Sequence, residues 1–205
     1  MNMEYQAFVK EAGHPAPPGW EGEDYPEDRG DHSVVNVSWY DAIAYCRWLT
    51  KKLRAAGWLR SDEVVRLPTE AEWEKAAGWD AEKKVKRIYP WGNEFDPAKC
   101  NTSEGGKGGT TPVGQTSPAG DSPYGASDMA GNVWEWCQDW YAGDYYQRSP
   151  SENPSGPEEG ESRVLRGGSW GGRQGLARCA YRLRDVPDDR DHLVGFRVAA
   201  SPSSP

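Results

Sequence analysis

The chain has 205 residues, a net charge of -8 and a mean hydropathy of -0.89. A chain of this length can bury a core without a metal or a disulfide, and the acidic balance argues against a general nucleic-acid or anionic-membrane surface. With 11 Trp and 10 Tyr but only 3 Phe, beside 24 Gly and 16 Pro, the composition predicts a core of large rings joined by irregular, turn-rich segments.

The N-terminal half predicts helices. Residues 2–11 have the spacing of a short amphipathic helix, and the Pro- and Gly-rich stretch 13–32 can be neither helix nor central strand. Ser38 and Asp41 have the capping-box spacing that opens a second helix, which Gly57 ends. The apolar positions of this helix share one face, and they are Trp39, Ala42, Ile43, Cys46, Leu49 and Leu53.

The same pattern recurs once, and short strands follow. A short strand at "VVRLP" leads to Thr69, which with Glu72 forms another capping box. Residues 96–127 have almost no periodicity, whereas rings and polar groups alternate over 133–140 as in a half-buried strand. Helices followed by short strands and long loops predict an α+β fold.

Two acidic residues bracket a Gly-containing turn in "DMAGNVWEW". Asp128 and Glu135 are carboxylates, and Ca²⁺ takes six to eight oxygen ligands, several of them from backbone carbonyls that such a loop can present. Paired acids in a loop are also commonly just solvated, and both interpretations stay open here. His14, His32 and His192 lack metal-ligand spacing.

Six segments taken in order carry a family resemblance. They are "NVSWYDAIAYCRWL", "RLPTEAEWEKAA", "YPWGNEFDP", "PYGASDMAGNVWEWCQDWY", "RVLRGGSW" and "VGFRV". Together they resemble the formylglycine-generating-enzyme (sulfatase-modifying factor) family. The resemblance implies a C-type lectin-like fold with two helices, a small twisted antiparallel sheet and extensive irregular loops. It implies one domain over residues 1–198, strands that would precede it, and a polar tail at 199–205.

The resemblance also implies calcium ligands. In these enzymes the segment matching "DMAGNVWEW" binds Ca²⁺, and the matching positions are the side chains of Asp128 and Glu135 and the carbonyls of Gly131 and Val133. A second family site would begin at Asn101 and Thr102, but no later acid aligns with it. A structural calcium ion is therefore expected, and copper, haem and nucleotide are not.

The chain departs from the family at its catalytic cysteines. The family's oxidase has two cysteines, five apart, between "GGS" and "RCA", and here that stretch reads "WGGRQGLA". Without a thiolate the oxidase chemistry has no agent, so no enzyme activity is expected. The resemblance also makes Cys46 and Cys179 neighbours, either as a disulfide or as a pair of thiols.

A second branch resembles the chain more closely: the variable proteins of diversity-generating retroelements. There "RGGSW" and "GFRV" enclose positions that adenine-directed mutagenesis changes from copy to copy. The resemblance implies a variable region at 164–198, in which Trp170, Arg178, Tyr181, Arg182, Pro187 and Gly195 form a constant frame. The expected ligand-binding residues are Trp170, Gly171, Gly172, Arg173, Tyr181, Leu183, Asp185, Val186, Asp189, Asp191, His192 and Leu193.

These observations give one preferred function and alternatives. The preferred function is a receptor- or adhesin-like protein that binds a protein on the surface of another cell, a virus or a host, without binding nucleic acid or inserting into a membrane. An oligomer is compatible with this function. The alternatives are a formylglycine-generating-enzyme-like oxidase with another centre, an accessory domain of a partner enzyme, and calcium-dependent carbohydrate binding by analogy with the fold. The sequence shows neither a signal-peptide pattern nor a transmembrane segment and assigns no compartment.

Overall fold

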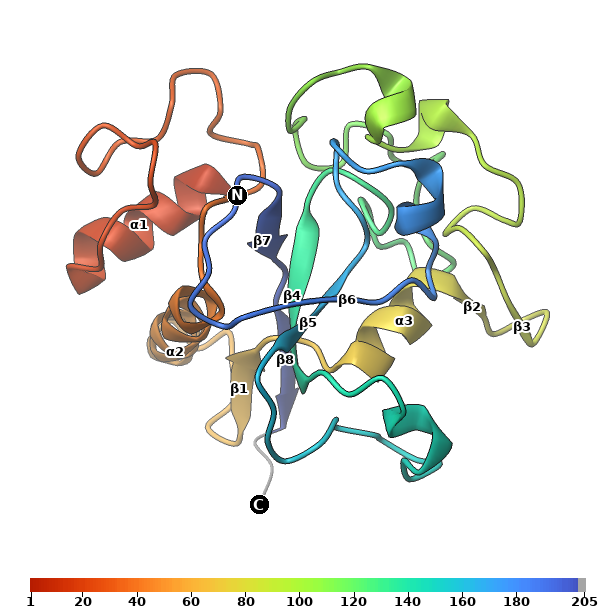
Figure 1. Ribbon diagram of the computed structural model, residues 1–205. Helices are drawn as coiled ribbons and strands as arrows, with labels where there is room; N and C mark the ends of the chain where they lie inside the picture. Colours follow the sequence, from red (N-terminus) through yellow and green to blue (C-terminus); the bar gives the residue numbers. More distant parts are fainter. Residues whose placement is uncertain (203–205) are drawn as a thin grey trace.

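The computed structural model describes residues 1–202. In this part of the chain, three α helices and eight short strands are joined by long loops that contain four 3₁₀ turns (Figure 1). The helices are α1 (Asn2–Ala12), α2 (Trp39–Ala55) and α3 (Glu70–Gly78). The strands are β1 (Glu63–Arg66), β2 (Trp79–Asp80), β3 (Val85–Lys86), β4 (Trp134–Trp140), β5 (Arg163–Arg166), β6 (Leu183–Asp185), β7 (Val194–Phe196) and β8 (Ala199–Pro202). The 3₁₀ turns are η1 (Pro97–Lys99), η2 (Ser103–Gly105), η3 (Tyr145–Gln147) and η4 (Gln174–Ala177).

The two predicted capping boxes are present. At the start of α2 the Ser38 hydroxyl accepts the backbone N–H of Asp41, and the Asp41 carboxylate accepts the N–H of Ser38. Thr69 and Glu72 make the same exchange at the start of α3. These bonds satisfy N–H groups that a helix leaves unpaired at its first turn, which explains why both helices begin where the sequence predicts.

The central sheet has four strands in the order β6-β5-β4-β7. β4 pairs antiparallel with β5, and β5 pairs antiparallel with β6, but β7 lies parallel to β4. The sheet is therefore mixed: the β4-β5 and β5-β6 pairs are antiparallel, as the resemblance implies, and the β4-β7 pair is parallel. α1 is the short helix that the spacing predicts over residues 2–11, and it stands beside the two helices that the capping boxes open.

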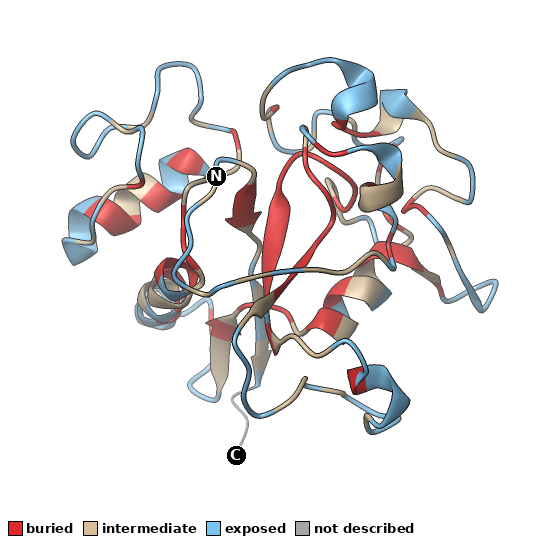
Figure 2. Ribbon diagram, viewed as in Figure 1, coloured by how far each residue is buried: buried red, intermediate tan, exposed pale blue. Residues whose placement is uncertain are grey.

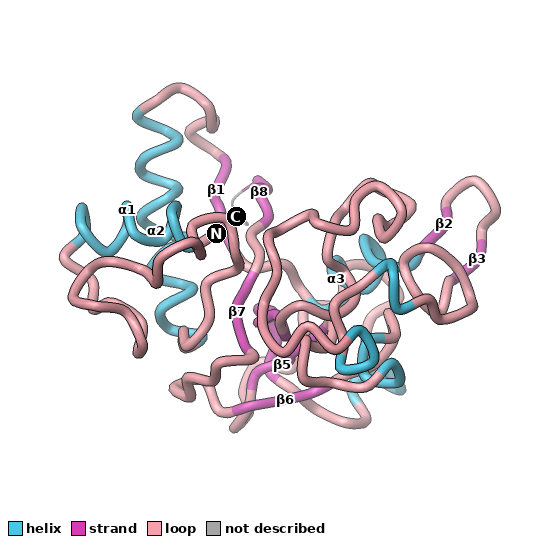
Figure 3. The backbone as a smooth tube through the Cα atoms, turned by 90° about the horizontal axis from the view of Figure 1, so that it is seen from above, coloured by secondary structure: helices cyan, strands magenta, loops and turns pink. Residues whose placement is uncertain are grey.

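The core lies on both sides of β4. Trp136 and Leu165 pack with Cys46 and other buried residues of α2, while Trp73 of α3 lies in a separate buried cluster with Cys137. Figure 2 shows the buried residues concentrated on β4 and β5 and on the inner faces of the helices. In the view from above, α1 and α2 lie to one side of the sheet and α3 with β2 and β3 to the other (Figure 3).

The C-terminal end differs from the predicted polar tail. Residues 199–202 form β8, which pairs antiparallel with β1 from Glu63↔Pro202 to Arg66↔Ala199. Half-buried and exposed residues alternate along β8, as is typical of a strand with one face against the protein and one face in solvent. The remaining residues of the predicted tail, 203–205, lie outside the described part of the chain.

Candidate ligand-binding surface

Both ends of the segment between residues 167 and 193 are fixed to the same position of β4. Glu135 lies opposite Arg166 of β5 on one side and opposite Gly195 of β7 on the other. A Cβ atom at Gly195 would collide with the backbone oxygen of Val34, so this position needs a glycine. The segment therefore starts at β5 on one side of β4, pairs with β5 through β6, and returns in β7 on the other side of β4.

A buried arginine holds the middle of this segment from below. Arg166 exposes 0% of its side chain, and its guanidinium donates to the backbone oxygens of Cys179 at 2.7 Å and Tyr181 at 2.8 Å. Its charge is balanced by Glu74 at 2.5 Å and by Glu70 at 3.5 Å. Removing one partner of such a buried group leaves an uncompensated charge, so these contacts fix the backbone here strongly.

Most of the predicted frame residues are also held by contacts within the fold. Arg182 makes a bidentate ion pair with the buried carboxylate of Glu70, at 2.6 and 2.8 Å. The Tyr181 ring lies 6.0 Å from that of Trp134, and the backbone oxygen of Pro187 accepts the N–H of Trp39 at 3.0 Å. These contacts connect the segment to Trp39 of α2, Glu70 of α3 and Trp134 of β4.

Five of the predicted binding residues are exposed, and we call them the exposed filler residues: Gly171, Arg173, Val186, Asp189 and His192. The half-buried Trp170 joins them, because its ring lies 5.8 Å from that of His192, whose side chain is 64% exposed. Leu193 lies beside Gly171 and packs against the core below.

Other predicted binding residues lie within the fold. Gly172 is buried: its N–H donates to the oxygen of Ser169, and its own oxygen accepts the N–H of Ser103. Leu183 lies in β6 opposite Leu165, and it packs against the hydrophobic core as Tyr181 does. Gly172 is therefore not exposed to a ligand, whereas Tyr181 and Leu183 are half-buried, with part of each side chain packed against the core.

The patch carries charges of both signs, because aspartates alternate with exposed arginines such as Arg173 and Arg184. Burial raises the pKa of Asp185, and the nearby carboxylates of Asp189 and Asp191 raise it further. The Asp185 side chain is fixed by the N–H of Val186, and that of Asp191 by the N–H of Leu193. The surface therefore combines the ring contact of Trp170 and His192 with a region of mixed charge.

The predicted calcium ligands do not stand ready for a cation. Asp128 and Glu135 line one cavity, but both oxygens of Glu135 accept from Arg197, at 2.5 and 2.7 Å, and one also accepts from the Trp73 indole at 2.6 Å. One oxygen of Asp128 accepts the N–H of Gly114. The donor chemistry suits Ca²⁺, but the ion fits only if Arg197 withdraws from Glu135. Within residues 1–202, no three His, Cys, Asp or Glu side chains form a group suited to hold a metal ion.

The cysteine expectation was wrong. All four cysteines are free and buried; Cys46 packs in the cluster under α2, whereas Cys179 packs with Cys137 beside α3. Burial raises the pKa of Cys46 and Cys179 to about 12 and that of Cys100 to about 11. The thiols are therefore protonated and poorly reactive near neutral pH.

Sequence reasoning missed the charged groups that organise the site. Arg166 and Arg197 stand in the quoted motifs "RVLRGGSW" and "VGFRV", but nothing in their spacing indicates partners more than sixty positions away, at Glu74 and Glu135. An arginine inside an otherwise apolar strand was the available signal, because a buried charge needs a partner.

Comparison with known proteins identifies the relatives. The model of the sulfatase-modifying factor enzyme 1-like domain matches residues 1–202. The chain is 41% identical to a formylglycine-generating enzyme of Thermomonospora curvata, over 85% of this chain and 57% of that protein. It is 36% identical to a hercynine oxygenase of Mycolicibacterium smegmatis, over 94% of this chain and 45% of that protein. The chain thus spans about half the length of these relatives.

Solved structures agree with this relationship. Treponema denticola variable protein 1 superposes with a TM-score of 0.72 at 26% identity, over 97% of this chain and 81% of that one. PvdO from Pseudomonas aeruginosa superposes with a TM-score of 0.75 at 29% identity, over 98% of this chain and 77% of that one. The predicted α+β, C-type lectin-like fold is confirmed. Within the described residues, no helix combines the length and apolar character needed to cross a bilayer.

Proposed function

We propose that this chain, which belongs to the sulfatase-modifying factor (formylglycine-generating enzyme) family, is a non-enzymatic ligand-binding protein. Its ligand surface would be formed by the exposed filler residues together with Trp170. The likeness to a variable protein of Treponema denticola supports diversification of this surface.

One observation carries the proposal: the segment 170–193 divides into residues that the fold needs and residues that it does not. Arg182 and Tyr181 are held by Glu70 and Trp134, whereas Arg173 and His192 are exposed. Exposed side chains away from such contacts can change at a cost within about 0.5 kcal/mol each. A surface of this kind can therefore vary without loss of the fold.

The expected ligand is a protein surface. The exposed filler residues lie on the outside of the segment and line none of the main cavities, and an open patch suits a broad epitope better than a small metabolite. Trp170 and Arg173 are the expected anchors, because Trp and Arg are enriched among residues that dominate binding energy. The partner's class, a surface protein of another cell, a virus or a host, is part of the proposal.

The first test is genomic. We expect a near-copy of the DNA encoding residues 170–193 downstream in the source genome, beside a reverse-transcriptase gene, differing only where the copy has adenine. The differing codons would then name the ligand-contacting positions. If no such copy exists, diversification is refuted, and the surface is an ordinary one.

The second test is biophysical. A library that randomises the exposed filler residues together should keep the melting temperature within a few degrees of the parent for most clones. The matched control is Arg182→Gln, which leaves Glu70 with one fewer partner and should lower stability by about 3 kcal/mol. Loss of folding across the library would refute the division into frame and filler.

The second candidate function, an oxidase, is favoured by the identity to formylglycine-generating enzymes. In this chain the loop 170–178 carries no cysteine, and all four thiols elsewhere are buried. Because a thiolate is the form that binds metals and reacts, we expect no copper-dependent oxygen consumption with a cysteine-containing peptide. Turnover in that assay would establish the oxidase and refute the non-enzymatic proposal.

Calcium at Asp128 and Glu135 is proposed separately. Calcium binding would release Arg197 from Glu135. Because the ion would bind the folded chain and not the unfolded one, Ca²⁺ should raise the melting temperature of the wild type relative to EDTA. The rise should vanish in Asp128→Asn and persist in the exposed control Asp144→Asn. An unchanged melting temperature in the wild type would refute calcium binding at this site.

A further inference from the structure

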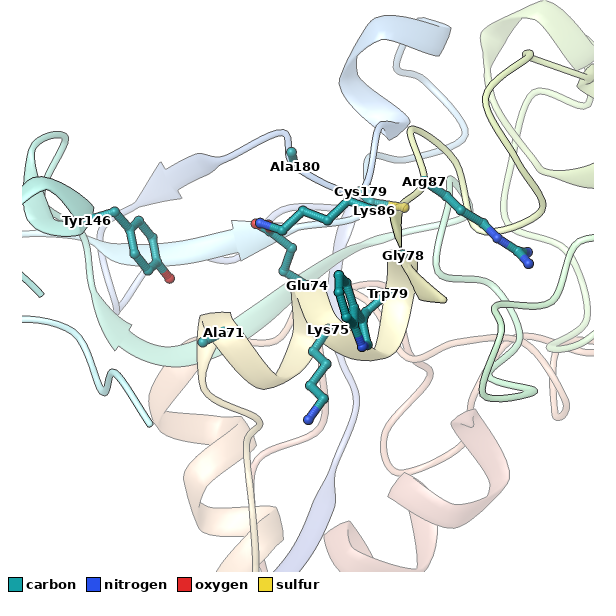
Figure 4. A pocket seen from close by; sticks show the side chains of 10 residues that line it. All are labelled: Ala71, Glu74, Lys75, Gly78, Trp79, Lys86, Arg87, Tyr146, Cys179 and Ala180. Atoms are coloured by element: carbon teal, nitrogen blue, oxygen red, sulfur yellow. The ribbon is translucent and has the colours of Figure 1, made fainter. Parts of the chain in front are cut away.

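A second cavity lies away from the ligand surface, along the outer face of α3. Its volume is about 620 Å³, and none of the exposed filler residues lines it. The α3 residues in its wall stand three or four positions apart, on one side of the helix. Figure 4 shows the lining residues, which are Ala71, Glu74, Lys75, Gly78, Trp79, Lys86, Arg87, Tyr146, Cys179 and Ala180.

The walls of this cavity are largely apolar. Tyr146 lies at one end of the cavity, near the start of α3, and Trp79 lies near the end of α3 (Figure 4). Ala71 and Ala180 line the cavity with small side chains, and the Glu74 and Lys86 side chains lie between the two rings in Figure 4. A flat apolar group can gain from contact with such rings, because aromatic side chains bury large areas and stack favourably.

Lys86 is the surplus cation of the cavity. Its ammonium lies 3.2 Å from the Glu74 carboxylate, but that carboxylate is already paired with the buried Arg166 at 2.5 Å. The Lys86 side chain is 76% exposed, and an ion pair at such a site contributes only about 0 to 1 kcal/mol. A ligand anion can therefore share Lys86 while Glu74 stays neutralised by Arg166.

The other charges do not cancel this excess. Glu70 and Glu74 are balanced by Arg166 and Arg182 before Lys86 is counted. The Arg87 guanidinium is paired with the buried Asp80 at 2.6 Å, and Lys75 has no ion-pair partner in the described part of the chain. The cavity is thus locally positive on a chain whose net charge is -8.

From this geometry we propose that the cavity binds a small amphipathic anion, with its flat apolar body against the aromatic walls at Tyr146 and Trp79 and its carboxylate at Lys86. The site is independent of the proposed ligand surface. A carboxylate head adds attraction that the neutral body lacks, and a cationic head on the same body meets repulsion.

Three probes that share one ring system test this binding: indole-3-acetate, indole and tryptamine. Titrations of the full chain are followed by calorimetry and by the indole N–H signals of the tryptophans in nitrogen-15 NMR spectra. We expect indole-3-acetate to bind about fivefold or more tightly than indole, and tryptamine more weakly than both. The Trp79 signal should shift, and that of Trp58, 83% exposed outside the cavity, should not.

Matched variants locate the charge and the space. Lys86→Gln should remove the preference for indole-3-acetate over indole, while the exposed Lys51→Gln keeps it. Ala180→Trp, at an exposed position, should fill the cavity and abolish binding of all three probes, while Ala55→Trp at the exposed end of α2 leaves it unchanged. Circular dichroism checks that each variant is folded. Equal affinity for the three probes, or unchanged binding in folded Ala180→Trp, would overturn the proposal.

Discussion

Asp139 is expected to make stability depend on pH. Its side chain lies at the start of α3, where one oxygen accepts the N–H of Glu70 at 2.8 Å, and the residue is only 2% exposed. The other oxygen has no hydrogen-bond partner within residues 1–202. Burial, and to a lesser degree the negative charges of Glu70 and Glu72, raise the pKa of Asp139 from 3.8 to about 6.

The sign follows from this raised pKa. The folded state binds the proton more tightly than the unfolded chain does, so the stabilisation is fully present below pH 3.8 and is lost as the pH rises through about 6. A shift of this size corresponds to about 3 kcal/mol in total, of which about 2 kcal/mol falls between pH 4.5 and 7.5. Asp139→Asn removes the titration and keeps an acceptor for the Glu70 N–H.

Urea unfolding followed by tryptophan fluorescence measures this effect. The free energy of unfolding of Asp139→Asn, minus that of the wild type, should rise by about 2 kcal/mol between pH 4.5 and 7.5. The control Asp144→Asn, at a side chain 60% exposed, should show a nearly constant difference over the same range. Parallel curves for Asp139→Asn and wild type would refute the reasoning.

Three further outcomes follow from contacts in the structure. Glu135→Gln should lower the free energy of unfolding by about 3 to 5 kcal/mol, because the Arg197 charge loses its partner. The exposed control Glu159→Gln should change it by less than about 0.5 kcal/mol. Urea unfolding at pH 7 compares the two variants, and equal losses of stability would contradict the role of the ion pair. Gly195→Ala should lower the melting temperature by several degrees through its clash with the chain before α2, while Gly175→Ala, with open space around it, should not, and similar temperatures would show that the strand can shift. A thiol reagent should label the native protein slowly and all four cysteines rapidly in urea; fast native labelling would contradict their burial.

The helices and the central strand could be predicted because their signals are local. The capping boxes at Ser38 and Thr69 each join residues three positions apart, and the alternation over 133–140 falls almost entirely within β4. Local hydrogen bonds and side-chain periodicity depend only on residues that are close in the sequence, so the sequence pattern is enough to predict them.

The pairing of distant groups could not be predicted in this way. The parallel alignment of β7 with β4, the contact of Arg197 with Glu135, and the separation of Cys46 from Cys179 all depend on how the chain returns after long loops. The sequence identified the exposed filler residues as candidates for ligand binding, but it could not tell them apart from Gly172 and Leu183, which are buried or half-buried. Those two are fixed by one turn and one strand pairing that form only in the folded chain.

Residues 167–193 are anchored on both sides of one residue of β4, and this anchoring allows their exposed stretches to change in length as well as in sequence. The ends of the segment meet beside Glu135, opposite Arg166 and Gly195, and the entropy of closing a flexible loop grows only as the logarithm of its length. Doubling such an insert costs about 0.6 kcal/mol, which is less than the loss of one buried ion pair. Grafts of different length can therefore be carried in the exposed stretches of this segment, provided that the backbone contacts to Arg166, the pairing of β6 with β5 and the ion pair of Arg182 with Glu70 are kept.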